Sequence, residues 1–227
     1  MTCIVGLIEN STVFMGADSM ASAGYNSYVR RDRKIFWRNS YLIGFTTSYR
    51  MGQLLMYAGD DPPAPPRKKA DLHRFMCVDW VNWVRKIYKE GGFLRTQDGT
   101  EIGGQFLVAV EQRLFRIGSD FQVMESACSF DAVGSGQEVA LGSLFTSKDM
   151  PSQQRIHTAL AAAEQWCKGV GRPFYILNTG QSSGAVTHSR KNTNSPKKPT
   201  SQKKRTSKQT SQNEKVVSSA KKQYPDP

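Results

Sequence analysis

Thr2, Asp18 and Lys34 have side chains that could act together in chemistry at the start of the chain. Thr2 follows the initiator Met1 directly, and methionine aminopeptidases remove Met1 when the next side chain is small. The mature chain would then begin with a threonine. Its hydroxyl is a nucleophile, and its own α-amine, with an ordinary pKa of about 7.7–8.0, can act as the base.

Asp18 and Lys34 would have to lie beside Thr2 to assist it. Asp18 ends the second predicted strand and Lys34 opens the third, so a meander can bring both to the start of the first strand. A lysine there would lower the pKa of the hydroxyl, and an aspartate would orient the lysine. The alternative is a surface aspartate at a strand end and one more basic residue in a basic loop.

The hydrophobic periodicity predicts hairpins in blocks, separated by blocks of helices. Residues 20–27 read as a loop, and Asp71 as the N-cap of the second helix. Blocks of this kind favour an α+β fold, here a four-layer α-β-β-α sandwich of antiparallel sheets. The predicted strands are 3–8, 12–17, 34–37, 41–45, 106–110, 114–117, 122–125, 132–133 and 174–177, and the predicted helices are about 51–58, 71–89, 138–145 and 153–168.

Five short motifs occur in the order found in one family of hydrolases, and two of them stand at that family's spacing from Thr2. They are Thr2-Cys3-Ile4-Val5-Gly6, Ala17-Asp18-Ser19, Lys34-Ile35, Ile43-Gly44-Phe45 and Gly134-Ser135-Gly136. With them, residues 2–178 resemble the N-terminal-nucleophile (Ntn) hydrolases of the proteasome β-subunit and HslV peptidase type.

The resemblance implies a role for each matched residue. Thr2 would be the nucleophile, Lys34 would stabilise it electrostatically, and Asp18 would position Lys34. The backbone N–H of Gly44 would stabilise the oxyanion, and Ser135 would bond near the amine of Thr2. The resemblance also places Ser22 where the family binds the substrate backbone, so that the peptide would add as a strand.

The sequence also departs from this family. Proteasome β-subunits carry a late aspartate that supports the serine of Gly-Ser-Gly, whereas residues 164–169 contain none. We expect no propeptide beyond Met1, which is HslV-like, and the proline-rich insert at 62–66 fits neither group. We therefore expect a divergent, proteasome-like protein.

Charge divides the chain into a nearly balanced body and a basic tail. Residues 180–227 hold 11 Lys and Arg against 2 Asp and Glu, a net of +9, out of +12 for the whole chain. We expect a peptidase domain over 1–178 and a disordered tail over 179–227. The tail could solubilise the protein or contact nucleic acid weakly and without sequence preference.

Other classes of protein are disfavoured. No apolar run is long enough to span a bilayer, and nothing at the amino end resembles a signal peptide. The separated cysteines predict free thiols in a reducing cytoplasm, with neither a metal site nor a disulfide scaffold.

The functional prediction is a threonine-type endopeptidase in a self-compartmentalised homo-oligomeric ring, acting on peptides or unfolded proteins. Its chemistry would need no cofactor; ATP would enter only through a partner unfoldase, since this chain has no Walker A motif. The main alternative is a non-catalytic ring or scaffold subunit. An amidase for small molecules is disfavoured by Thr2, because such family members usually begin with Cys or Ser.

Overall fold

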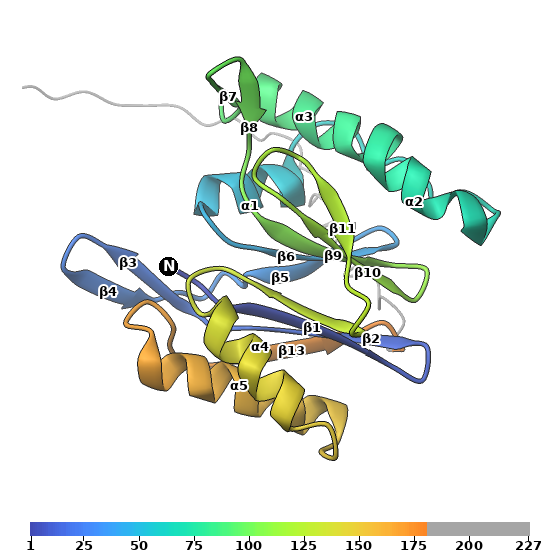
Figure 1. Ribbon diagram of the computed structural model, residues 1–227. Helices are drawn as coiled ribbons and strands as arrows, with labels where there is room; N and C mark the ends of the chain where they lie inside the picture. Colours follow the sequence, from blue (N-terminus) through green and yellow to red (C-terminus); the bar gives the residue numbers. More distant parts are fainter. Residues whose placement is uncertain (181–227) are drawn as a thin grey trace, which may run out of the picture. The chain divides into compact units, whose positions relative to one another are not determined.

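A computed structural model describes residues 1–180, which form two large antiparallel sheets flanked by helices, and two two-stranded hairpins (Figure 1). The predicted tail lies outside the described residues from 181 onward. The strand orders are β12-β1-β2-β13 and β11-β10-β9-β6-β5. The first sheet comprises β1 (Ile4–Glu9), β2 (Thr12–Ala17), β12 (Phe130–Val133) and β13 (Tyr175–Asn178), and the second comprises β5 (Ile35–Arg38), β6 (Tyr41–Phe45), β9 (Phe106–Val110), β10 (Arg113–Ile117) and β11 (Val123–Glu125).

The helices fall into two groups along the chain, as predicted. The first group lies between β6 and β9, and the second lies between β12 and β13. The first group is α1 (Tyr49–Tyr57), η1 (Lys69–Asp71), α2 (Leu72–Phe75), the π-helical η2 (Met76–Trp80) and α3 (Val81–Glu90), and the second is α4 (Gln137–Thr146) and α5 (Ser152–Trp166).

Alternation of side chains along the central strands produces the layers. On β1, Ile4 belongs to the core between the two sheets, whereas Val5 belongs to a core shared with α4 and α5. On β6, Leu42 faces the core between the sheets and Ile43 faces the core under α1–α3. Because successive side chains on a strand point to opposite faces, each sheet is buried on both sides. The resulting order is helices, sheet, sheet, helices (Figure 1), and the predicted α+β class is confirmed.

Tight turns fix the register of the long hairpins. Asn10 and Ser11 have φ values of 48° and 59° between β1 and β2, and Glu111 and Gln112 have φ values of 49° and 66° between β9 and β10. Two successive left-handed residues form the type I′ turn whose twist suits a hairpin. The hairpins expected from the predicted strands 3–8 with 12–17 and 106–110 with 114–117 are confirmed.

One local prediction was wrong. Residues 20–27 are not a loop but the hairpin of β3 (Met20–Ala23) and β4 (Asn26–Val29), whose small polar residues lack the alternation that marks a half-buried strand. Asp71 is the N-cap residue of α2, as predicted, although its side chain makes no capping hydrogen bond. A further short hairpin, β7 (Arg95–Gln97) with β8 (Thr100–Ile102), was not predicted.

No helix within residues 1–180 has both the length and the apolar character needed to cross a membrane.

Arg38, at the end of β5, closes the C-terminal end of α1. Its guanidinium donates hydrogen bonds to the carbonyls of Leu55 at 2.8 Å, Ala58 at 2.9 Å and Asp60 at 2.8 Å. It also lies 4.9 Å from the ring centroid of Trp83. The last carbonyls of a helix have no partner within the helix, and a cation there also favours the helix dipole. One buried side chain therefore ties the β5–β6 hairpin to α1.

We predict that Arg38→Met lowers the free energy of unfolding by about 3 kcal/mol, because several carbonyls lose charged donors in a buried setting. Urea unfolding followed by tryptophan fluorescence measures this. Arg50→Met is the matched control on α1, since the exposed Arg50 makes only a 3.4 Å bond to the carbonyl of Gly91. Equal stability of the two variants would show that Arg38 does not hold the helix end.

Candidate active site

Thr2 is held at the start of β1 by the segment that joins β12 to α4. The Thr2 N–H donates to Ser135 Oγ at 3.1 Å. The carbonyl of Thr2 in turn accepts from Ser135 Oγ and from the N–H of Gly136, both at 3.3 Å. Thr2 is only 6% exposed. The backbone of Thr2 is therefore fixed on both sides of its Cα, and the predicted neighbourhood of Thr2 and Ser135 is present in the structure.

Gly134 explains why this connection needs glycine. Its φ is +102°, which residues with a side chain rarely adopt. A Cβ placed there would lie 2.3 Å from the carbonyl oxygen of Thr2. The absence of a side chain lets the 134–136 segment come close enough to hydrogen-bond with the backbone of Thr2.

The carboxylate of Asp18 is the centre of the site. Oδ1 accepts from the N–H of Cys3 at 3.0 Å and from Lys34 Nζ at 2.8 Å. Oδ2 accepts from the N–H of Met20 at 3.0 Å and from that of Gly171 at 3.2 Å. Asp18 is fully buried. Besides the neighbouring Met20, it joins three positions that are distant in sequence, Cys3, Lys34 and Gly171, and Cys3 directly follows Thr2.

Lys34 completes a buried ion pair with Asp18. Lys34 is 1% exposed, and its ammonium also donates to the carbonyl of Met20 at 2.6 Å. Burial lowers the pKa of Lys34 below the ordinary value of 10.5, and the charge of Asp18 opposes this shift. Because Lys34 Nζ and the N–H of Cys3 bond to the same carboxylate oxygen, the ammonium lies next to the backbone that carries Thr2.

Cys3 adjoins Thr2 but is a poor rival nucleophile. Burial, reinforced by the nearby Asp18, raises the pKa of the Cys3 thiol to about 12. The reactive form of cysteine is the thiolate, which is scarce at neutral pH with such a pKa. The hydroxyl of Thr2 is therefore the better candidate at this position.

A small cavity of about 80 Å³ lies beside Thr2. Ser22, predicted to bind substrate backbone, is among its lining residues. The remaining lining residues are Met1, Thr2, Ala21, Phe45, Thr46, Thr47, Ser48 and Tyr49. Sequence reasoning missed the stretch from 45 to 49, although its hydroxyl-rich sequence directly after the Ile-Gly-Phe motif was a usable signal.

Gly44 lies just behind this cavity and does not line it. It belongs to β6, where it pairs with Ile35 on one side and Leu107 on the other. A Cβ on Gly44 would meet Ile4 at 2.6 Å and Met15 at 2.7 Å, so its open side faces the core between the sheets. The oxyanion role implied for Gly44 stays a prediction.

Thr47 has an unusual backbone at the edge of the cavity. Its φ of 60° is rare for a β-branched residue. Contacts of the side chain hold the backbone in this conformation. Thr47 Oγ1 accepts a hydrogen bond from the N–H of Gln105 at 3.1 Å and lies 3.1 Å from Thr46 Oγ1. Such strain often accompanies functional sites, and here it shapes the turn between β6 and α1.

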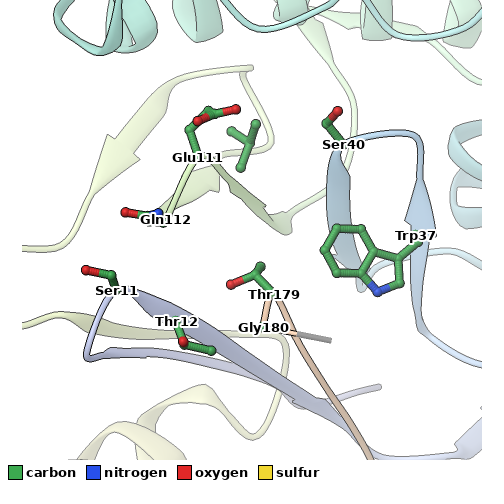
Figure 2. Close-up of a pocket in the computed structure, with 9 residues that line it drawn as sticks. Ser11, Thr12, Trp37, Ser40, Glu111, Gln112, Thr179 and Gly180 are labelled. Atoms are coloured by element: carbon green, nitrogen blue, oxygen red, sulfur yellow. The ribbon is translucent and has the colours of Figure 1, made fainter. Parts of the chain in front are cut away.

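A larger hollow of about 380 Å³ lies among the hairpin turns (Figure 2). It is lined by Ser11, Thr12, Trp37, Glu111 and Thr179, among others. Ser11 and Thr12 adjoin the far end of β1, and a six-residue strand is about 20 Å long. This hollow is therefore remote from Thr2 and contains none of the predicted catalytic residues.

Within residues 1–180, no group of His, Cys, Asp and Glu side chains could hold a metal ion.

Comparison with known proteins identifies the fold. No family model and no curated protein sequence matches the chain. Among solved structures, a Thiobacillus denitrificans BPH in complex with epoxomicin has a TM-score of 0.65 and 22% identity, covering 78% of this chain and 97% of that one.

Two further structures are similar over the same share of this chain. Eukaryotic HslV from Trypanosoma brucei has a TM-score of 0.54 and 15% identity, with 98% of that chain covered. Anbu, an ancestral β-subunit from Yersinia bercovieri, has a TM-score of 0.56 and 15% identity, with 81% covered. At these identities the likeness concerns the fold. The chain has the proteasome-like Ntn-hydrolase fold.

Proposed function

We propose that this protein is a threonine-type peptidase whose nucleophile is Thr2 after removal of Met1. The observation that supports this best is the Asp18 carboxylate, which holds the Lys34 ammonium and the N–H of Cys3 on one oxygen. The hydrogen bond from the N–H of Thr2 to Ser135 Oγ marks the place where the free amine would lie.

In the proposed reaction, Thr2 Oγ attacks the carbonyl carbon of the peptide bond while the α-amine of Thr2 takes the hydroxyl proton. The C–N bond then breaks, and the amine returns that proton to the departing amino group. An ester remains on Oγ, and water, deprotonated by the same amine, hydrolyses it. Lys34 favours each step by stabilising negative charge on Oγ.

The surroundings of Thr2 suit a peptide substrate. Ser22 on β3 and the stretch 45–49 line the cavity and offer hydroxyls and backbone groups to an extended chain. The resemblance assigns the oxyanion bond to the N–H of Gly44. The BPH from Thiobacillus denitrificans was solved in complex with epoxomicin, and we propose that this compound also binds here.

Assembly and partners belong to the same proposal. We expect a homo-oligomeric ring in the cytoplasm that receives unfolded protein from an ATP-dependent unfoldase. A cofactor would not be needed, because base, nucleophile and cation all come from the chain. The charge of residues 180–227 separately predicts weak nucleic-acid contact without sequence preference.

The alternative is a ring or scaffold subunit without activity, and Met1 distinguishes the two. While Met1 is present, the nitrogen of Thr2 is an amide and cannot serve as the base. The hydroxyl of Thr2 also donates to the carbonyl of Met1 at 2.5 Å. A chain that retains Met1 would be inert. The identity of the first residue in the purified protein, Met1 or Thr2, therefore distinguishes the two proposals.

We predict that Thr2→Ala abolishes hydrolysis of fluorogenic peptides, with a loss of about a thousandfold or more in kcat. Intact-mass spectrometry must first show that the wild-type chain begins at Thr2. Thr100→Ala, at an exposed position on β8, is the control and should retain full activity. Equal turnover by Thr2→Ala and wild type would reject the mechanism.

The pH profile tests the base and Lys34 together. Activity should rise as the α-amine of Thr2 loses its proton, near an ordinary pKa of about 7.7–8.0. It should fall again at alkaline pH as Lys34 loses its charge, and this fall should begin below 10.5 because burial lowers the pKa of Lys34. The measurement is kcat/KM from about pH 6 to about pH 11, with circular dichroism as a check on folding. A profile that stays flat above pH 10.5 would show that the charge of Lys34 is not required.

A further inference from the structure

We infer that Tyr49 limits the cavity beside Thr2, so that the residue on the amino side of the cleaved bond must be small, such as Gly, Ala or Ser. This inference rests on the proposed peptidase function and adds the substrate class. It follows from the position of one aromatic ring, the contacts that hold it and the space that it leaves.

Tyr49 is the first residue of α1, directly after the N-cap Ser48, whose hydroxyl accepts from the N–H of Arg50. Its ring lies edge-on to that of Phe45, with centroids 5.7 Å apart and an interplanar angle of 81°. Lys34 Nζ is 5.9 Å from the ring centroid. The ring therefore stands between the helix start and the buried lysine, on the wall of the cavity that contains Thr2.

A stacked cation holds the ring in place. The Arg30 guanidinium lies 3.7 Å from the centroid of the Tyr49 ring. Arg30 is itself fixed by two hydrogen bonds to Asp32, at 2.7 and 2.6 Å. A cation over an aromatic face and an edge-on ring are both favourable contacts. Since none of these contacts involves Met1, removal of Met1 leaves the ring where it is.

The hydroxyl of Tyr49 does not explain the choice of a tyrosine at this position. It is buried and has no hydrogen-bond partner among the described residues. Its burial raises the pKa of Tyr49 to about 12, so the ring carries no charge at neutral pH. The contribution of Tyr49 to the site is therefore its bulk.

The remaining space is small. With Met1 among its lining residues the cavity measures about 80 Å³, whereas an apolar cavity of about 150 Å³ is known to admit benzene. Removal of Met1 opens the cavity where Met1 lies, but the Tyr49 wall stays because Arg30 and Phe45 hold its ring. A phenylalanine or leucine side chain would need the volume that Tyr49 now occupies. The polar residues Ser22, Thr46 and Ser48 also line the cavity, which suits a small side chain better than a long apolar one.

The test compares peptide coumarin amides that differ only in the residue before the cleaved bond: Ala, Leu or Phe. The processed wild type should cleave the Ala peptide about tenfold better in kcat/KM than the Leu or Phe peptide. Tyr49→Ala should raise the ratio of kcat/KM for the Leu or Phe peptide to kcat/KM for the Ala peptide by about tenfold, whatever happens to the absolute rates.

Tyr49→Phe is the matched control, because it keeps the ring and removes only the hydroxyl; its preference should equal that of wild type. Labelling of Thr2 by peptide epoxyketones with Ala or Leu beside the warhead, followed by mass spectrometry, reports the same preference without turnover. A wild-type preference for Leu or Phe, or an unchanged ratio in Tyr49→Ala, would overturn this inference and leave the peptidase proposal standing. If the processed chain neither cleaves the peptides nor is labelled at Thr2, the proposed function itself is rejected.

Discussion

The candidate site depends on one buried carboxylate. Asp18 carries its charge where water cannot reach it, and such a charge is tolerated only when a cation and hydrogen-bond donors compensate it. The compensation comes from Lys34 and from the N–H groups of Cys3, Met20 and Gly171. Each donor belongs to a different part of the chain, so the need to satisfy this carboxylate brings β1, β3, β5 and the loop before β13 to one point.

Glycine and serine serve the site in a different way from the ion pair. The 134–136 segment needs a residue without a side chain at Gly134, because the carbonyl of Thr2 occupies the space where a Cβ would lie. Ser135 can then reach both polar groups of the Thr2 backbone. The ion pair supplies charge to the site, whereas this segment supplies close backbone contact and fixes the orientation of Thr2.

Much of this could be predicted from the sequence. The strands of the sandwich were readable because apolar runs alternate with turn residues. The resemblance to a known family pointed to Thr2, to Asp18 and Lys34 at their spacing from Thr2, and to Ser135 in its Gly-Ser-Gly motif. The β3–β4 hairpin was missed because exposed polar strands have no periodic signal. The wall formed by residues 45–49 was missed because it depends on how β6 ends against α1, and the capping role of Arg38 needed the far end of the same helix. Both are tertiary contacts that local patterns do not encode.

The hairpin of β5 and β6 holds α1 at both ends of the helix. Arg38 binds the last carbonyls of α1, and the turn after β6 leads directly into its first residue, Tyr49. A helix anchored in this way cannot easily tilt or slide. Sequence changes at its first turn would then reshape the cavity beside Thr2 without disturbing the scaffold. Under the proposed function, substrate selectivity can therefore change one side chain at a time while Thr2, Asp18 and Lys34 stay as they are.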